Sequence, residues 1–203
     1  MLNLGRQLGL KISVVCGVLA PILAFSCILL SIRFASDFSW TDNALSDLGV
    51  MPNPTAILFN SGLIISGILG IVFALGLFSF LNGKSAGRAG TLLFLLDCLA
   101  LAAIGVFSEN TGRIHFYVSV AFFALFPFSM FLMTAYFVLT SRNRMAVFTF
   151  LVSVFAVAVW VAEFWVRYVP GVAIPETFSG IAASFWVIVT CFIMLRAASR
   201  PDK

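Results

Sequence analysis

The feature that most constrains this chain is a series of apolar runs, each about twenty residues long, that recur along its whole length. A helix rises 1.5 Å per residue, so such a run crosses a hydrocarbon core about 30 Å thick. Of the 203 residues, 62% are hydrophobic and only 10% are charged. A soluble domain of this size needs a more polar surface. The sequence therefore predicts an all-α integral membrane protein.

We predict a single transmembrane domain, residues 1–203, built as a six-helix bundle. The first apolar run continues well past "AFSC", where Phe25 suits a leader-type cleavage site poorly, so we expect it to remain as a span. The predicted spans are about 12–33, 55–81, 90–108, 114–140, 145–165 and 177–195.

The basic residues predict the orientation of the bundle. If the spans alternate, nine of the twelve Lys and Arg residues lie on one side and three on the other. Because basic residues are enriched in cytoplasmic loops, the N- and C-termini are predicted to be cytoplasmic in a multi-pass cell-membrane protein. This explains the net charge of +4 without a nucleic-acid partner. The majority set is Arg6, Lys11, Lys84, Arg88, Arg142, Arg144, Arg196, Arg200 and Lys203, and the minority set is Arg33, Arg113 and Arg167.

Acidic residues gather on the opposite, extracytoplasmic side, although the positive-inside rule does not require this. Six helices in one domain must bring their three outer loops close together, so we predict one shared polar site. The alternative is that these carboxylates only hydrate the membrane surface. The acids on this side are Asp37, Asp42, Asp47, Glu109, Glu163 and Glu176.

The only histidine, His115, begins the fourth predicted span. Glu109 and Arg113 precede it closely, and Ser119 follows four residues later on the same helix face. Histidine titrates near neutral pH, so this group is a candidate for acid–base chemistry. An interfacial histidine that caps a loop is the alternative.

Two further acids at helix ends have simple structural explanations. Glu163 and Arg167 are four residues apart, which predicts a local ion pair. Glu176 is expected in the first turn of the sixth span, where the helix dipole favours an acid. We keep Glu163, Glu176 and Arg167 as candidate site residues beside these explanations.

Asp97 lies near the middle of the third predicted span. An ionised carboxylate there costs about 2.5–3.5 kcal/mol, and such residues usually face a cavity or a partner. The alternative is a hydrogen-bonded structural acid. In the second span, Gly62, Ser66 and Gly70 form a small-residue stripe that predicts close helix packing, including a homo-oligomer contact.

Metal binding stays open at this point. The four cysteines lie inside apolar runs without CxxC spacing, so neither a zinc site nor a disulfide framework is indicated. A single histidine also argues against a zinc hydrolase. An oxygen-rich site suits Mg²⁺, Ca²⁺ or Mn²⁺, and a site without metal is equally compatible. The candidate ligands are Asp47, Glu109, His115 and Glu176.

Three segments of the chain read "LSDLG...NPTAILFNSGLIISGIL", "GVFSEN...IHFYVSVAFF" and "IPETFSGIAASFW". Together they resemble an uncharacterised family of archaeal and bacterial six-span membrane proteins, domain of unknown function 998. "SDLG" is also similar to the "ISDTG" segment of Frag1/DRAM-type membrane proteins, some of which are tied to lipid remodelling. In the domain of unknown function 998 family, the last acid is often followed by arginine, whereas Thr177 follows Glu176 here. By position the resemblance picks out Ser46, Asp47, Gly49, Asn60, Glu109, His115, Ser119 and Glu176.

Three classes of function fit these observations. The first is a lipid-handling intramembrane enzyme, hydrolase-like or transferase-like, in which the Asp/Glu/His cluster activates water or binds a metal and Ser119 or Ser46 orients it. The second is a small-solute or proton-coupled transporter that uses Asp97. The third is a lipid-binding or assembly protein without chemistry. We predict the first, with membrane lipid as the partner.

Overall fold

The computed structural model describes residues 4–81 and 83–198. In this part of the chain there are six α-helices and no strand, and all six helices are long and apolar enough to cross a membrane. The predicted all-α, six-span fold is therefore confirmed. The helices are α1 (Leu4–Phe34), α2 (Ala56–Phe80), α3 (Ser85–Val106), α4 (Arg113–Leu139), α5 (Asn143–Val166) and α6 (Ala173–Ala198).

The observed helices exceed the predicted spans most at the starts of α1, α3 and α6. Helix α1 begins eight residues before residue 12, and α3 begins five residues before residue 90. Both starts carry charged or small residues, such as Lys11 and Arg88. Hydropathy marks only the membrane-embedded part of a helix, whereas backbone hydrogen bonding continues past it.

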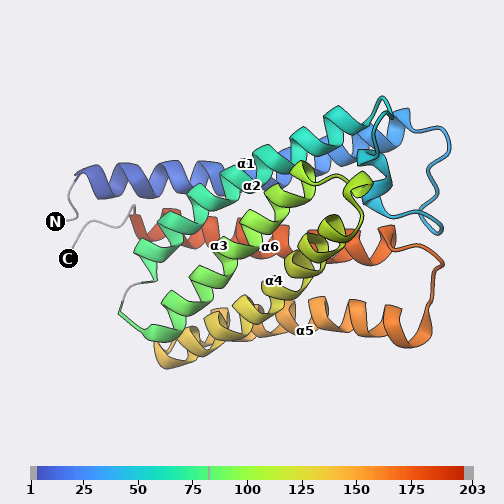
Figure 1. Ribbon diagram of the computed structural model, residues 1–203. Helices are drawn as coiled ribbons and strands as arrows, with labels where there is room; N and C mark the ends of the chain where they lie inside the picture. The colour runs from blue at the N-terminus through green and yellow to red at the C-terminus, as the bar shows by residue number, and fades with distance from the viewer. Residues whose placement is uncertain (1–3, 82, 199–203) are drawn as a thin grey trace.

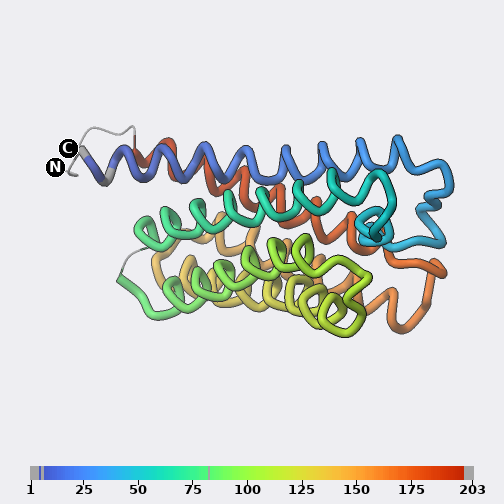
Figure 2. Tube along the Cα trace, turned by 45° about the horizontal axis from the view of Figure 1, so that its top comes forward, coloured from blue at the N-terminus to red at the C-terminus, as the bar shows by residue number. Residues whose placement is uncertain are grey.

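The six helices form a closed ring. Each packs mainly against its neighbours in the chain, and α6 closes the ring by packing against α1 (Figure 1). Across the ring the contacts are few and involve mainly α4 and α6. The tube in Figure 2 shows the helices running roughly antiparallel along one long axis. The helices enclose a cavity whose lining residues come from α1–α4, α6 and the loop between α1 and α2.

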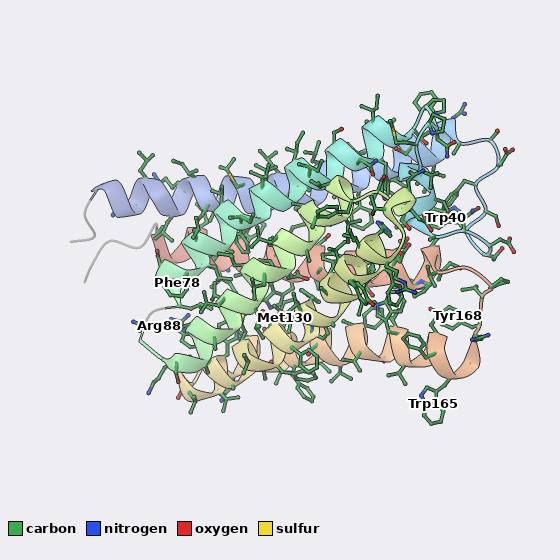
Figure 3. All side chains as sticks on the ribbon, viewed as in Figure 1. Trp40, Phe78, Arg88, Met130, Trp165 and Tyr168 are labelled. Atoms are coloured by element: carbon green, nitrogen blue, oxygen red, sulfur yellow. The ribbon has the colours of Figure 1, made fainter. Side chains whose placement is uncertain are left out.

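The bundle has two distinct ends. The loop end holds residues 35–55, 107–112 and 167–172, and the terminal end holds the start of α1 and the end of α6 (Figure 1). Trp40, Trp165 and Tyr168 lie at the loop end, and Arg88 lies at the terminal end (Figure 3). All three aromatic residues are exposed, as is usual at the lipid headgroup level.

Which end faces the cytoplasm stays a prediction. Arg200, Lys203 and the side chain of Arg6, which contribute to the predicted orientation, lie outside the part of the chain that the structure describes.

The terminal half of the ring is filled by large side chains. Phe73, Met133, Trp186 and Met194 are fully buried there. Trp186 packs against Phe94, and its Nε1–H donates a hydrogen bond to Thr149 Oγ1 at 3.0 Å. The cavity is thus closed toward the terminal end.

The small-residue stripe of α2 is used inside the chain. A Cβ atom at Gly62 would lie 2.7 Å from Cys27 Sγ on α1, and one at Gly70 would lie 2.8 Å from Cys98 Sγ on α3. Ser66 is also buried. The stripe packs α2 against α1 and α3 within one chain, and the homo-oligomer stays a prediction.

Candidate functional site

The loop between α1 and α2 contains a short 3-10 helix, η1 (Leu45–Gly49), at the loop end. The Asp47 carboxylate accepts hydrogen bonds from the Ala44 backbone N–H at 2.9 Å and the Asn43 side chain at 2.7 Å. These bonds cap η1. Asp47 thus stabilises the loop in which it lies. The adjacent Ser46 is buried.

Glu176 connects this loop to α6. It lies in the first turn of α6, as predicted, and its Oε2 accepts a hydrogen bond from the Leu45 backbone N–H at 2.7 Å. Three backbone bonds reinforce the link: Gly171 N–H donates to Thr41 O, and the N–H groups of the next two residues donate to Asn43 O. Glu176 therefore has a structural partner that sequence spacing does not reveal.

Glu109 approaches the same place from the loop between α3 and α4, where it begins the short helix η2 (Glu109–Thr111). The next residue, Asn110, ties this loop to the first one: its side chain accepts from Met51 N–H at 2.7 Å and donates to Met51 O at 3.0 Å. One Glu109 carboxylate oxygen, Oε2, is buried without a hydrogen-bond partner.

Burial raises the pKa of Glu109, and the nearby charge of Asp47 raises this pKa further. Ser46 and His115 act on the Glu109 pKa in the opposite direction. Asp47 and Glu109 also interact electrostatically with Glu176. The structure thus brings together three predicted carboxylates from three separate loop-end segments.

His115 lies beside this cluster and is buried, with 8% of its surface exposed. Its Nδ1 lies 2.7 Å from the carbonyl oxygen of Phe107, and its Nε2 lies 3.3 Å from Ser119 Oγ. A carbonyl oxygen only accepts, so Nδ1 carries the hydrogen. In neutral His115 the Nε2 atom is therefore an acceptor, and the Ser119 hydroxyl donates to it.

A cavity of about 140 Å³ runs from this cluster into the ring. Ser46, Ser119 and Glu176 line its polar end, and most of its remaining wall is apolar. Phe73 and Phe94 lie at its deep end, where the filled terminal half begins. Asp97 also lines the cavity, as the sequence predicted for an acid within a span.

The remaining predicted residues do not join the cluster. Arg113 and Arg167 have exposed side chains. Arg167 terminates α5 in a left-handed conformation (φ 47°, ψ 57°), and its backbone N–H donates to Glu163 O. The positive φ turns the Arg167 side chain away from the direction that a helical residue would give it. The structure shows no Glu163–Arg167 ion pair, and Glu163 Oε2 is buried without a hydrogen-bond partner.

The carboxylates and His115 are not arranged as a metal site. In residues 4–81 and 83–198, no three His, Cys, Asp or Glu side chains are grouped so that they could hold an ion. This geometry gives no support to the divalent metal that the sequence left open.

Sequence reasoning missed the groups that hold the site together. The Asn43 side chain donates to Asp47 within its own loop, the Asn110 side chain binds the Met51 backbone across loops, and their residue type alone signals only turns. The Phe107 carbonyl has no side-chain signal at all. Asn60, which the family resemblance selected, donates to Gly49 O at 3.0 Å and so fixes the end of η1.

The raised pKa of Glu109 predicts how stability depends on pH. The folded state keeps a proton on Glu109 above its ordinary pKa of 4.5, where the unfolded state has lost it. Stability therefore falls as pH rises through this window. Glu109→Gln should flatten the decline of Tm as pH rises above about 4.5, measured in detergent.

Asp42→Asn is the matched control for this prediction. Hydrogen bonds from Ser39 and Thr41 lower the pKa of Asp42, so this exposed carboxylate is ionised in both states above about pH 5. Its replacement should leave the slope of Tm against pH unchanged. A Glu109→Gln protein with the wild-type slope would contradict the prediction.

Six membrane-spanning helices with a polar cluster at one end and an apolar cavity below it define a polytopic membrane protein. The family described as Protein of unknown function (DUF998) matches residues 18–193, and the chain belongs to this family. Comparison with curated proteins and with solved structures finds no match, so similarity to Frag1/DRAM-type proteins is not shown.

Proposed function

We propose that this protein is an intramembrane acyl hydrolase or acyltransferase that acts on a membrane lipid with an uncharged or cationic headgroup. The supporting observation is the hydrogen-bonded series of Ser119 hydroxyl, His115 imidazole and Phe107 carbonyl at the polar end of an apolar cavity. A hydroxyl that donates to a histidine is the arrangement of an activated nucleophile. The largely apolar wall of the cavity suits an acyl chain.

In the proposed reaction, Ser119 Oγ attacks the carbonyl carbon of the lipid ester while its proton passes to His115 Nε2. The bond from this carbon to the headgroup oxygen then breaks, and that oxygen takes the proton from His115. Water or an acceptor alcohol next attacks the acyl–Ser119 ester, giving its proton to His115, which returns it to Ser119. The Phe107 carbonyl holds Nδ1–H throughout, so Nε2 always faces Ser119.

Ser46 supplies a second hydroxyl at the same end of the cavity. In the proposed reaction it donates a hydrogen bond to the carbonyl oxygen as negative charge develops there.

The charge around the cavity end selects the headgroup. Asp47, Glu109 and Glu176 lie close together, and neither Arg113 nor Arg167 reaches them. Carboxyl groups exchange hydrogen bonds with hydroxyl and ammonium groups, whereas a phosphate finds no cationic partner among them and is repelled by those that are ionised. A polyol or amine headgroup therefore fits better than an anionic one.

Two other functions compete with this proposal. A lipid-binding or assembly protein would use the same cavity without chemistry. A proton-coupled carrier using Asp97 needs a polar path to the terminal end, and in the described residues that route is filled by Phe73, Phe94 and Trp186. The acyl-transfer proposal is preferred because it alone uses the Ser119–His115 contact.

The test is an assay with monoolein, a lipid ester with an uncharged polyol headgroup. Full-length protein in detergent or nanodiscs is expected to release oleate, detected by mass spectrometry, whereas Ser119→Ala should bind monoolein without releasing oleate. Phosphatidylglycerol, with its anionic headgroup, should be a poor substrate. Monoolein binding without release by the wild type would favour the binding protein, and no binding would overturn the proposal altogether.

A further inference from the structure

Two polar groups deep in the cavity have no partner in the structure. Asp97 is 97% buried, given its exposed fraction of 3%, and its Oδ1 atom lacks a hydrogen-bond partner. Ser66 is 1% exposed, and its Oγ atom also lacks one. Both residues line the cavity. A buried polar atom without a partner destabilises the folded state, so two in one cavity require an explanation.

The two groups lie at the same level of the α2–α3 interface. A Cβ atom at Gly67, next to Ser66, would lie 2.8 Å from the carbonyl oxygen of Cys98, which is next to Asp97. Ser66 is ten residues from the start of α2, and Asp97 is nine residues from the end of α3. At 1.5 Å per residue, both lie roughly 14–15 Å below the loop-end termini of their helices.

This depth separates them from the polar end of the cavity. Ser46 and Glu176 lie in η1 and the first turn of α6, and Ser119, six residues into α4, lies roughly 9 Å below the loop end. Leu63 and Leu101, at about the depth of Ser119, belong to the apolar part of the wall above Asp97 and Ser66. The cavity therefore has a polar end, an apolar section and a second polar level.

Other buried hydroxyls without partners do not share this position. Ser31, Ser179 and Thr190 also have an unpaired oxygen, but none of them lines the cavity. Thr190 is 1% exposed, like Ser66, and so serves as a matched residue outside the cavity.

We propose that Asp97 and Ser66 form a second subsite, which binds a hydroxyl group carried partway along the apolar chain of the lipid. A hydroxyl both donates and accepts, so it can pair with a carboxyl and a serine hydroxyl together. It also brings no charge into the membrane interior, whereas a charged group would be costly there. This inference rests on the proposed lipid occupancy of the cavity and deepens it, because it names a class of hydroxylated acyl chains.

The test compares monoolein with monoricinolein, which differ only by one mid-chain hydroxyl. Full-length Ser119→Ala protein is mixed with equal amounts of both lipids, so that neither ester is consumed, and the bound lipids are identified by native mass spectrometry. One net hydrogen bond predicts a preference for monoricinolein of roughly threefold to tenfold. Equal binding of the two lipids would overturn the subsite while leaving the proposed function intact.

Variants in the same background locate the effect. Asp97→Leu should abolish the preference and Ser66→Ala should reduce it, while Asp97→Asn, which still forms hydrogen bonds, should retain it. Thr190→Val, the matched control, should also retain it. A preference that survives both Asp97→Leu and Ser66→Ala would overturn the assignment. Absence of binding by either lipid would instead overturn the proposed function together with the subsite.

Discussion

Replacing His115 by alanine is expected to lower the rate of monoolein cleavage by about 100- to 10,000-fold, the usual contribution of a general base. The reason is specific to the geometry: His115 Nε2 is the acceptor for the Ser119 hydroxyl, and Nδ1 is held by the Phe107 carbonyl. Without the imidazole, Ser119 has no base to take its proton. The measurement is kcat and KM for oleate release.

Binding should respond much less than turnover. His115 does not itself line the cavity, whereas Ser119 does, so KM should change only a few-fold while kcat falls. Tyr117→Phe is the control, because Tyr117 lies two residues away on α4 with 64% of its surface exposed. A His115→Ala protein with near-wild-type kcat would show that the histidine is only a cap for the 107–112 loop.

Gly171→Ala is expected to destabilise the protein and to separate the loops of the site. A Cβ atom at Gly171 would overlap the Asn43 carbonyl oxygen and would lie 2.5 Å from the Asp42 carbonyl carbon. Both neighbours are backbone, so neither can rotate away. Overpacking of this kind costs about 1–3 kcal/mol, and each kcal/mol lowers Tm by roughly 2–4 °C for a chain of this size.

The effect of Gly171→Ala should extend to the site because Gly171 donates to Thr41 O in the bond network that holds η1 against α6. Activity should therefore fall further than the loss of folded protein explains. Gly9→Ala on α1 is the matched control: nothing lies within 4 Å of its added Cβ, and alanine favours helix. Equal Tm values for the two variants would contradict the close packing at Gly171.

The membrane fold was predictable because its signal is strong and local. An apolar run of about twenty residues determines a span almost by itself, and all six were found. We predicted that the three outer loops converge, because six helices in one domain bring their loops close together. The structure places Asp47, Glu109 and Glu176 close together.

Details that depend on backbone geometry could not be predicted. The Glu163–Arg167 pair fails because Arg167 leaves the helix in a left-handed conformation, which spacing of four residues does not anticipate. The stripe at Gly62, Ser66 and Gly70 signals close packing correctly but does not identify the partner helix. The role of Phe107 depends on a carbonyl group, which every residue has.

The bond between Leu45 N–H and Glu176 joins residues 131 positions apart, and α6 is the helix that closes the ring. During synthesis, the first five helices would already be in the bilayer before Glu176 arrives. The proposed chemistry would therefore depend on the completion of biogenesis, because a nascent or truncated chain carries Ser119 and His115 before Glu176 joins the Leu45 loop to α6. Under the proposed function, no lipid ester would be cleaved until the whole bundle has assembled.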